Sequence, residues 1–397
     1  MPIPLIGVVL VLVLLVLSAP FKTPFKDDVA PAPPAASARS ETDNRYERQG
    51  AEIAQAYAQY KQKVAQVWGE EAVVPDAKRN VTYRDNLRQR SVVDFEEGVV
   101  TVELAVAPDK AQDSDTLQSQ LATAVGQTVL QGPDDRSIVE MAEHPDAPQH
   151  RGPSALVGLI ANEDGSPFTL EDLEDFQTVA AKAMLTHPLT GADGEARVVV
   201  TTEFKLVPDH LRVQAEKFRD SIERYAQQHA MPAPLIYAII ETESAFNPLA
   251  RSPIPAFGLM QLVPQTGARE AFKFLYSKDQ VVSERHLYIP DKNIELGTAY
   301  LHLLYHRYFK KVKDPESRKW LAVAAYNAGP INVVSTFAGR YSRAKFASTY
   351  IWKRQAFKKI NKMPPAKLFT YLRRHLPARE TRNYLYKVHS RVDKYRV

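Results

Sequence analysis

The sequence predicts an α+β domain followed by an all-α domain. Segments that alternate or are rich in β-branched residues are confined to the first half, at residues 80–84, 91–96, 99–106 and 196–204. From Pro208 onward, apolar residues recur instead at steps of three and four, which is the period of a helix. With 397 residues and 45% hydrophobic content, the chain is long enough to build two domains with their own cores.

The first twenty residues hold an uncharged apolar run from Ile3 to Leu17. Its length is typical of a signal peptide and short for a membrane span, but no lysine or arginine precedes it, and Pro20 would hinder cleavage after Ala19. Residues 1–20 are therefore predicted to be either a cleaved signal peptide or a retained membrane anchor. Residues 21–44 are rich in Pro, Ala and Ser and are expected to form an extended linker.

Residues 45–205 are predicted to form the α+β domain. A helical pattern covers residues 45–68, and Glu97-Gly98 is a plausible hairpin turn between the second and third strand segments. Two further helical windows, near residues 115–130 and 169–185, precede the last strand. The acidic residues of this domain are spread over polar faces and its histidines have no ligand-like or catalytic spacing, so no catalytic constellation is expected here.

Residues 206–397 are predicted to form the helical domain. Residues 208–230 have one apolar face, and Pro232 and Pro234 end that helix and open the next. More helices are expected at residues 264–276, 293–309, 315–327, 330–338, 344–358, 366–374 and 378–395.

Charge divides the chain in the same way. Residues 1–205 carry 18 basic and 31 acidic side chains, whereas residues 206–397 carry 33 and 15. The basic half should attract polyanions, or it is simply a solvated basic face. No nucleic-acid-reading motif, Gly-rich phosphate loop or HExxH-type pair appears, and cysteine is absent, so neither nucleic acid nor a cofactor or metal is expected.

One carboxylate lies on an apolar face. In the helix that starts near Pro234, residues Leu235, Ile239 and Glu243 are four apart and share one stripe, whereas Glu241 is expected to face away. Desolvation at the end of such a stripe raises the pKa of a carboxyl toward neutrality, which suits a general acid. The alternative is that Glu243 is a satisfied capping or salt-bridged residue.

Three further stretches favour the catalytic interpretation. The segment SPIPAFGLMQLVPQTG contains Gly258, which could let backbone approach a ligand, and Gln261, which both donates and accepts hydrogen bonds. The segment AAYNAGP presents Tyr326 and Asn327 at a helix end, and ARETRNYLYKV carries Tyr384 together with an acid, Glu380. Aromatic faces and amides are what a sugar-binding cleft uses.

These motifs, ESAFNPLA, GLMQLVPQTG, AAYNAGP and ETRNYLYKV, resemble in kind and order the catalytic domain of the soluble-lytic-transglycosylase type. The resemblance covers roughly residues 230–390 and implies a lysozyme-like helical fold that cleaves peptidoglycan glycan strands without a cofactor. It also implies that Glu243 is the catalytic acid. By the same resemblance the substrate-binding residues are Ser244, Met260, Gln261, Tyr326, Asn327 and Tyr384.

The preceding domain, with VWGEEAVVPDAKRNVTYRDN and KLVPDHLRVQAEKF, is similar to the N-terminal domain of the membrane-bound lytic transglycosylase C family. A periplasmic enzyme is therefore expected, anchored by residues 3–17 if that segment is retained. Two departures stand out. Pro255 occupies a position where the wider family often has glycine, and the cysteine that is acylated in members of the C type is missing.

The reaction implied is cleavage of the β-1,4 bond between N-acetylmuramic acid (MurNAc) and N-acetylglucosamine (GlcNAc) with closure of a 1,6-anhydro ring. Substrate-assisted enzymes need a single carboxylate, but Glu380 stays a candidate for a second one unless it only starts the last helix. Two alternatives remain open: a lysozyme-like hydrolase on the same scaffold, and a non-catalytic wall-binding or adaptor protein.

Overall fold

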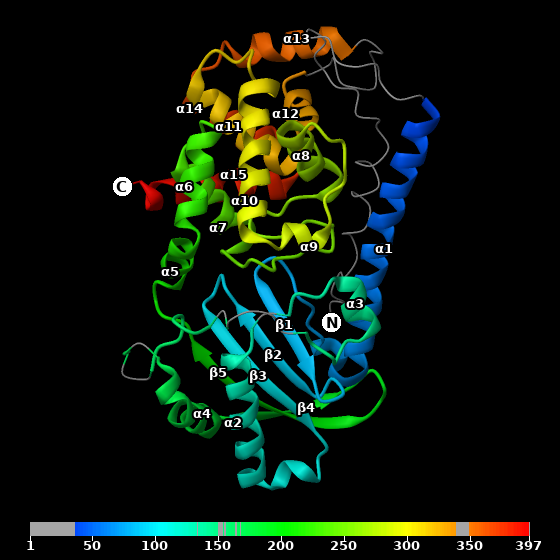
Figure 1. The fold of residues 1–397 in the computed structure, drawn as a ribbon, viewed down its shortest axis with the longest axis vertical. Helices are drawn as coiled ribbons and strands as arrows, with labels where there is room; N and C mark the ends of the chain where they lie inside the picture. The colour runs from blue at the N-terminus through cyan, green and yellow to red at the C-terminus, as the bar shows by residue number, and fades with distance from the viewer. Residues whose placement is uncertain are drawn as a thin grey trace, which may run out of the picture.

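The computed structural model describes residues 36–132, 134–149, 154, 156–162, 165–166, 168–338 and 349–396. The apolar run 3–17, and with it the choice between signal and anchor, lies outside the described residues. Figure 1 shows a sheet domain at one end of the molecule, a helical domain at the other, and the long helix α1 (Ala36–Trp68) along one side. The expected order, an α+β domain and then an all-α domain, is confirmed.

The sheet has five antiparallel strands in the order β1-β2-β3-β5-β4. Its strands are β1 (Arg79–Arg84), β2 (Gln89–Asp94), β3 (Val99–Val106), β4 (Leu185–Thr190) and β5 (Ala196–Lys205). The predicted turn between β2 and β3 is present, with Gly98 in the left-handed region at φ 68°. Strand β4 was not predicted, because LTHPLT contains Pro188 and lacks alternation. It is an edge strand, where a proline is tolerated.

Helices cover both faces of the sheet. Helices α2 (Ser114–Leu130) and α4 (Leu173–Lys182) pack on one face, where Val100 and Val102 share a core with Leu121. On the other face Val81 and Tyr83 join the core of α1, beside α3 (Ile138–Glu143). Because successive side chains of a strand point to opposite faces, the strands contribute apolar residues to two separate cores.

Three helix predictions in this part differ from the structure. Helix α1 begins at Ala36, inside the predicted linker, where the prolines that would interrupt a helix have stopped at Pro34. Helix α4 ends at Lys182, since the chain then enters β4. Helix α3 was missed, although a capping box of Ser137 and Glu140 marks its start. The boundaries 45–205 and 206–397 stay a prediction.

The helical domain follows the proline pattern of the sequence. Its helices are α5 (His210–Lys217), α6 (Arg219–Gln228), α7 (Ala233–Ser244), α8 (Arg269–Tyr276), α9 (Glu284–Leu287), α10 (Pro290–His302), α11 (Pro315–Ala328), α12 (Pro330–Ser335), α13 (Thr349–Ile360), α14 (Pro365–His375) and α15 (Arg379–Val392). Prolines occupy the first turn of α7, α10, α11, α12 and α14, where the fixed φ of the ring suits the helix and no amide donor is needed.

Shorter turns complete the chain. The 3₁₀ turns are Gly69–Glu71, Lys110–Gln112, Leu170–Asp172 and Asp393–Tyr395, and the π-helical turns are Pro264–Ala268 and Leu303–Tyr308. The single helix predicted for residues 208–230 is broken at Phe218, which has φ −112° and ψ 4° and whose ring stacks on Phe246 at 6.5 Å. Packing of that ring overrides the continuous helical pattern.

One hydrophobic core connects the two domains. It contains Tyr60 and Trp68 of α1, Val81 of β1 and the buried residues of α7, among them Leu235 and Ile239. In the described part of the chain, none of the helices combines the length and the apolar character that a bilayer crossing requires. The sheet domain is therefore packed against the helical domain through a shared interior, and the loop that follows α7 lies at this junction.

Candidate active site

Helix α7 carries the predicted catalytic acid in its last turn. The helix is apolar on nearly all sides, and Leu235, Ile236, Ile239 and Ile240 are all buried. Glu243 is partly exposed, in contrast to the residues on both sides of it. The helix ends at Ala245, whose φ of 49° and ψ of 38° are left-handed. This sharp ending leaves the Glu243 carboxyl at the edge of the buried helix rather than inside it.

Glu241 was expected to face away from the apolar stripe that Glu243 shares. Its side chain has other neighbours than Glu243 has, but it is also buried. The side chain of Glu241 is 2% exposed. Its carboxylate is 3.0 Å from Arg391 Nε and 2.8 Å from Lys394 Nζ, and it accepts a hydrogen bond of 2.6 Å from the Tyr395 hydroxyl. Glu241 is thus a structural anion that attaches α7 to the C-terminal segment.

Burial raises the pKa of Glu243 to about 7. Two neighbours oppose that effect and lower the pKa: the hydroxyl of Tyr384 and the charge of Lys78. A third neighbour, Glu380, raises it. A carboxyl with a pKa near 7 is protonated in a large fraction of molecules at neutral pH, so it can donate a proton and later accept one.

Two tyrosines face this carboxyl. Tyr384 of α15 is buried, and its hydroxyl has no partner of ordinary hydrogen-bond geometry among the described residues. Its interaction with Glu243 therefore involves a long or poorly aligned contact, as catalytic hydrogen bonds often are without substrate. Tyr326 of α11 also interacts electrostatically with Glu243. Burial and that charge hold the pKa of both phenols well above the usual value, so both stay neutral donors.

The loop after α7 is fixed by side chains that the sequence analysis did not single out. Asn293 of α10, fully buried, accepts a hydrogen bond of 2.8 Å from Met260 N and donates to the carbonyl oxygens of Phe257 and Leu287 at 2.9 and 2.8 Å. Tyr326 donates to Met260 O at 2.8 Å. This loop is therefore held on both sides, by α10 and by α11.

Two residues predicted to bind substrate are wholly inaccessible in this structure. Ser244 is 0% exposed, and its hydroxyl lies 2.8 Å from the Leu259 carbonyl oxygen, to which it donates. Met260 is also 0% exposed, and its side chain packs against Gly297. Both residues therefore pack within the loop in this structure, and their role in substrate binding stays a prediction. A serine next to the catalytic glutamate gives no sequence signal that distinguishes these two roles.

Gly258 likewise serves the fold. It has φ 75°, and a Cβ there would lie 2.2 Å from Leu287 O and 2.3 Å from Asn293 Nδ2. The close approach that glycine permits is therefore to the protein itself and not to a ligand. Pro255 lies in the same loop, between the bridged residues Arg251 and Phe257, where the sequence departs from the wider family.

Gln261 and Asn327 remain accessible. Gln261 is partly exposed, has a left-handed φ of 45°, and uses its side-chain amide to donate to Gly258 O at 3.0 Å. Its side-chain oxygen and second amide hydrogen are left for other partners. Asn327 is partly exposed beside Tyr326, where α11 ends. In the structure Glu243, Tyr326 and Tyr384 therefore lie together. Gln261 lies in the loop that Tyr326 binds through Met260 O.

The two other acids of the region are in surroundings different from those of Glu243. Glu241 is used in the ion cluster described above. Glu380 is exposed in the first turn of α15, where an acid is stabilised by the helix dipole. Across the described residues, no group of three or more His, Cys, Asp or Glu side chains could hold a metal ion.

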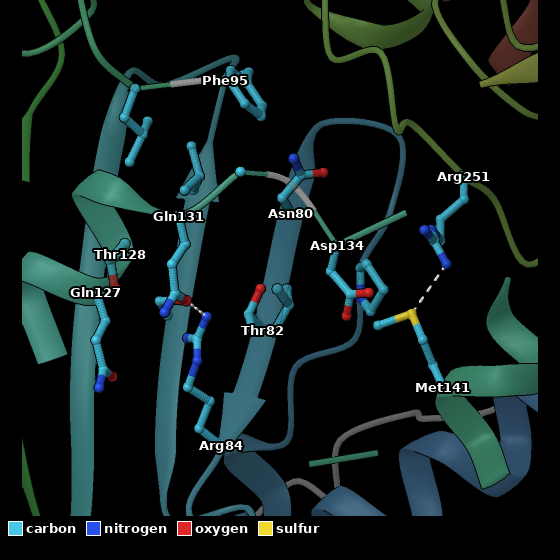
Figure 2. A pocket seen from close by; sticks show the side chains of 16 residues that line it. Asn80, Thr82, Arg84, Phe95, Gln127, Thr128, Gln131, Asp134, Met141 and Arg251 are labelled. Carbon is cyan, nitrogen blue, oxygen red and sulfur yellow. Dashed lines mark hydrogen bonds between the residues drawn. The ribbon is translucent and has the colours of Figure 1, made fainter. Parts of the chain in front are cut away.

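A separate concave site lies on the sheet domain, as Figure 2 shows. Asn80, Thr82 and Arg84 of β1 line one side, and Gln131, after α2, bonds to Arg84. The helical domain contributes Arg251, which is buried and donates hydrogen bonds to Arg136 O and Met141 Sδ, both at 3.0 Å. None of the predicted site residues lines this pocket, so it belongs to the domain junction and not to the surroundings of Glu243.

Comparison with known families agrees with this architecture. Residues 220–349 match the transglycosylase SLT domain, and residues 46–217 match the N-terminal domain of membrane-bound lytic murein transglycosylase C. Together the two matches define the class of protein: a lytic transglycosylase preceded by an N-terminal domain.

The chain is 30% identical over 339 residues to membrane-bound lytic murein transglycosylase C of Salmonella arizonae, covering 85% of this chain and 88% of that protein. It is 31% identical over 340 residues to the protein of the same name from Sodalis glossinidius, with the same coverage of each chain. The chain therefore belongs to the membrane-bound lytic murein transglycosylase C family, and the resemblance seen in the sequence is confirmed.

Among solved structures, the 70 kDa soluble lytic transglycosylase from Escherichia coli is 27% identical, with a TM-score of 0.34. The similarity covers 57% of this chain and 28% of that one, so the present chain spans about a quarter of that structure.

Proposed function

We propose that this protein cleaves the β-1,4 bond between MurNAc and GlcNAc in peptidoglycan and leaves a 1,6-anhydroMurNAc end, with Glu243 as the single acid and base. The observation that carries the proposal is the state of Glu243: a partly exposed carboxyl whose burial raises its pKa to about 7, beside two neutral tyrosines. Membership of a lytic murein transglycosylase family supports the same substrate.

In the first step, protonated Glu243 donates its proton to the glycosidic oxygen, and the bond from that oxygen to the muramoyl C1 breaks. The substrate's own acetamido group stabilises the positive charge at C1, so no second carboxylate is required. This agrees with the positions of the other two acids, since Glu241 is held by Arg391, Lys394 and Tyr395, and Glu380 is exposed at the start of α15.

In the second step, Glu243 is a carboxylate and takes the proton of the muramoyl C6 hydroxyl. The C6 oxygen attacks C1 and closes the anhydro ring. The proton lost from the C6 hydroxyl equals the one given to the leaving sugar, so the reaction consumes no water. A group with a pKa near 7 is suited to both steps because neither protonation state is strongly disfavoured.

The accessible polar groups near Glu243 are proposed to bind the sugar. Gln261 and Asn327 offer amide donors and acceptors for hydroxyl and acetamido groups, and the rings of Tyr326 and Tyr384 form part of the wall. Ser244 and Met260 support the site indirectly, because their hydrogen bonds fix the loop that carries Gln261.

Cell-envelope targeting is proposed to come from the N-terminal apolar run. The relatives are named membrane-bound, and this chain has no cysteine that could carry a lipid. Residues 3–17 then direct the enzyme to the periplasmic side of the membrane, whether or not they are removed. Fractionation of cells expressing the full chain or a chain lacking residues 1–35 tests this: the shortened protein should stay in the cytoplasm.

The reaction is tested by mass spectrometry of muropeptides released from purified sacculi by the wild type and by Glu243→Gln. Products lighter by one water than hydrolysed muropeptides, absent with the variant, are expected. Reducing-end products would indicate a lysozyme-like hydrolase. Binding to sacculi without release by either protein would indicate a wall-binding protein.

A further inference from the structure

Lys78 is a residue of the sheet domain whose side chain reaches the end of the catalytic helix. Its Nζ donates hydrogen bonds of 2.8 Å to the carbonyl oxygens of both Glu241 and Thr242. These carbonyls belong to the last turn of α7, at the negative end of the helix dipole, and the Glu241 carbonyl also accepts the helix-ending hydrogen bond of 3.1 Å from Ala245 N. A cation at this position caps the helix at the two residues that directly precede Glu243.

The backbone of Lys78 is fixed before the side chain extends. The Asp76 carboxylate accepts hydrogen bonds of 2.8 Å from the backbone amides of Lys78 and Arg79. The Lys78 carbonyl accepts a hydrogen bond of 3.0 Å from Phe95 N. Two residues further on, Asn80 accepts a hydrogen bond of 2.9 Å from Asn247, just after α7. The start of β1 is therefore attached to α7 by Lys78 and to the residues just after α7 by Asn80, and Lys78 is the charged contact.

Charged groups from three elements face Lys78. The turn between β2 and β3 contributes Glu96, α7 contributes Glu243, and α15 contributes Lys387 and Arg391. Glu96 is already paired, at 3.2 Å from Arg391. The Glu241 carboxylate on the other side of α7 is likewise taken, by Arg391, Lys394 and the Tyr395 hydroxyl.

Glu243, in contrast, forms no ion pair with any described residue, and Lys78 is the cation that acts on it. Burial lowers the pKa of Lys78 to about 8, against the effects of Glu96 and Glu243, so Lys78 is still largely charged at neutral pH.

We propose that Lys78 is a positioning residue through which the N-terminal domain holds the last turn of α7 and places a positive charge beside the catalytic acid Glu243. The inference rests on the proposed role of Glu243 and gives the N-terminal domain a part in the reaction. That domain is then required for the catalytic geometry and not merely attached to it.

The sign of the electrostatic effect follows from the charges. A cation near Glu243 favours its ionised form, so removing the cation raises the pKa of Glu243. Because the first step needs protonated Glu243, kcat/KM falls as pH rises through that pKa. The alkaline limb of the profile should therefore move to higher pH when Lys78 becomes neutral, although the helix cap is weakened at the same time.

The test compares pH profiles of kcat and KM for the full-length wild type and Lys78→Met on soluble glycan strands prepared from sacculi. Lys387→Met is the matched control, because Lys387 is about half exposed at the same junction and lies 3.9 Å from Glu96 rather than near Glu243. We expect Lys78→Met to lower kcat about tenfold with little change in KM, and to shift the alkaline limb upward by roughly half a pH unit. Lys387→Met should keep the wild-type limb.

Lys78→Arg separates charge from packing, since it keeps the charge and should return the limb to its wild-type position. If Lys78→Met does not fold by circular dichroism, Lys78→Gln replaces it as the neutral variant. The inference would be overturned if the alkaline limb of the pH profile did not shift in a folded Lys78→Met or Lys78→Gln variant, or if Lys78→Arg did not restore the wild-type limb. Either result would leave the proposed function intact. Wild-type activity in Glu243→Gln would instead overturn the proposed function, so the two failures are distinguishable.

Discussion

Glu241 and Glu243 lie two residues apart in the same helix, but their carboxyls are in opposite electrostatic situations. Glu241 is surrounded by Arg391, Lys394 and the Tyr395 hydroxyl, which together satisfy its charge. The carboxyl of Glu243 has only a poorly aligned tyrosine and the charge of Lys78 to offset its burial, and its pKa rises to about 7. One helix thus carries a structural carboxylate and, half a turn away, the carboxyl that we propose as the proton donor.

The ion cluster of Glu241 predicts a stability effect without a chemical one. Glu241→Gln removes the charge of a buried carboxylate that pairs with Arg391 and with the half-exposed Lys394, and should lower the free energy of unfolding by about 2 kcal/mol. Denaturant unfolding measures this loss. The folded variant should still release anhydro products. Loss of activity at unchanged stability would contradict the structural role.

The raised pKa of Glu243 predicts a pH dependence of catalysis. Because the first step requires the protonated carboxyl, kcat/KM of the wild type should fall above pH of about 7. Activity on soluble glycan strands between pH 5 and 9 measures this limb. A flat profile across neutrality would mean that Glu243 is ionised throughout, as an ordinary glutamate would be.

The same pKa predicts how the free energy of unfolding depends on pH. The contribution of Glu243 is lost as pH rises, whereas that of a paired carboxylate is lost as pH falls. The folded protein binds the proton of Glu243 more tightly than the unfolded chain does, so this group favours folding below the unfolded pKa. As pH rises through the folded value near 7, Glu243 ionises and that contribution is lost. Glu243→Gln should remove this part of the pH dependence of unfolding, which melts at several pH values would reveal.

Tyr384 and Tyr326 should respond differently to loss of their hydroxyls. Tyr384→Phe removes a group that lowers the pKa of Glu243, so the alkaline limb of kcat/KM should move upward with little loss of stability. Tyr326→Phe breaks the 2.8 Å hydrogen bond to Met260 O and should cost about 1 kcal/mol. The two pH profiles and two melts distinguish these roles. A stability loss confined to Tyr384→Phe would contradict the assignment.

Asn293 should be one of the most sensitive polar residues of the loop. Asn293→Ala removes three buried hydrogen bonds, to Met260, Phe257 and Leu287, and should cost about 3 kcal/mol. Asn361→Ala is the matched control, because Asn361 makes two exposed hydrogen bonds, to Lys313 N and Lys311 O. Equal losses in the two variants would show that the Asn293 bonds do not hold the loop.

Much of the helical domain could be predicted because local signals decided it. Prolines at helix starts and the three-to-four periodicity place the start of α7, and both limits of α11 and α14, within one residue of the observed positions. The break at Phe218 and strand β4 could not be predicted, since stacking on Phe246 and pairing with β5 depend on residues distant in the sequence.

The raised pKa of the Glu243 carboxyl could be predicted, because its place on an apolar helix face is a local signal. The burial of other motif residues could not. Ser244 and Met260 are polar or polarisable residues inside a motif, and the sequence does not reveal that both point into the core. Asn293 lies outside the quoted motifs, and Lys78 lies in the segment quoted for the N-terminal domain, where nothing marks it as a site residue. Both act on backbone groups, which leave no pattern in side-chain types. Both were missed for that reason.

The central claim, that Glu243 closes a ring without water, is tested most directly by digesting sacculi in water enriched in heavy oxygen. The account predicts muramoyl ends that carry no heavy oxygen, because the C6 oxygen of the sugar itself attacks C1. Heavy oxygen at C1 of the released products would show that water is the nucleophile, and would contradict the account in favour of hydrolysis.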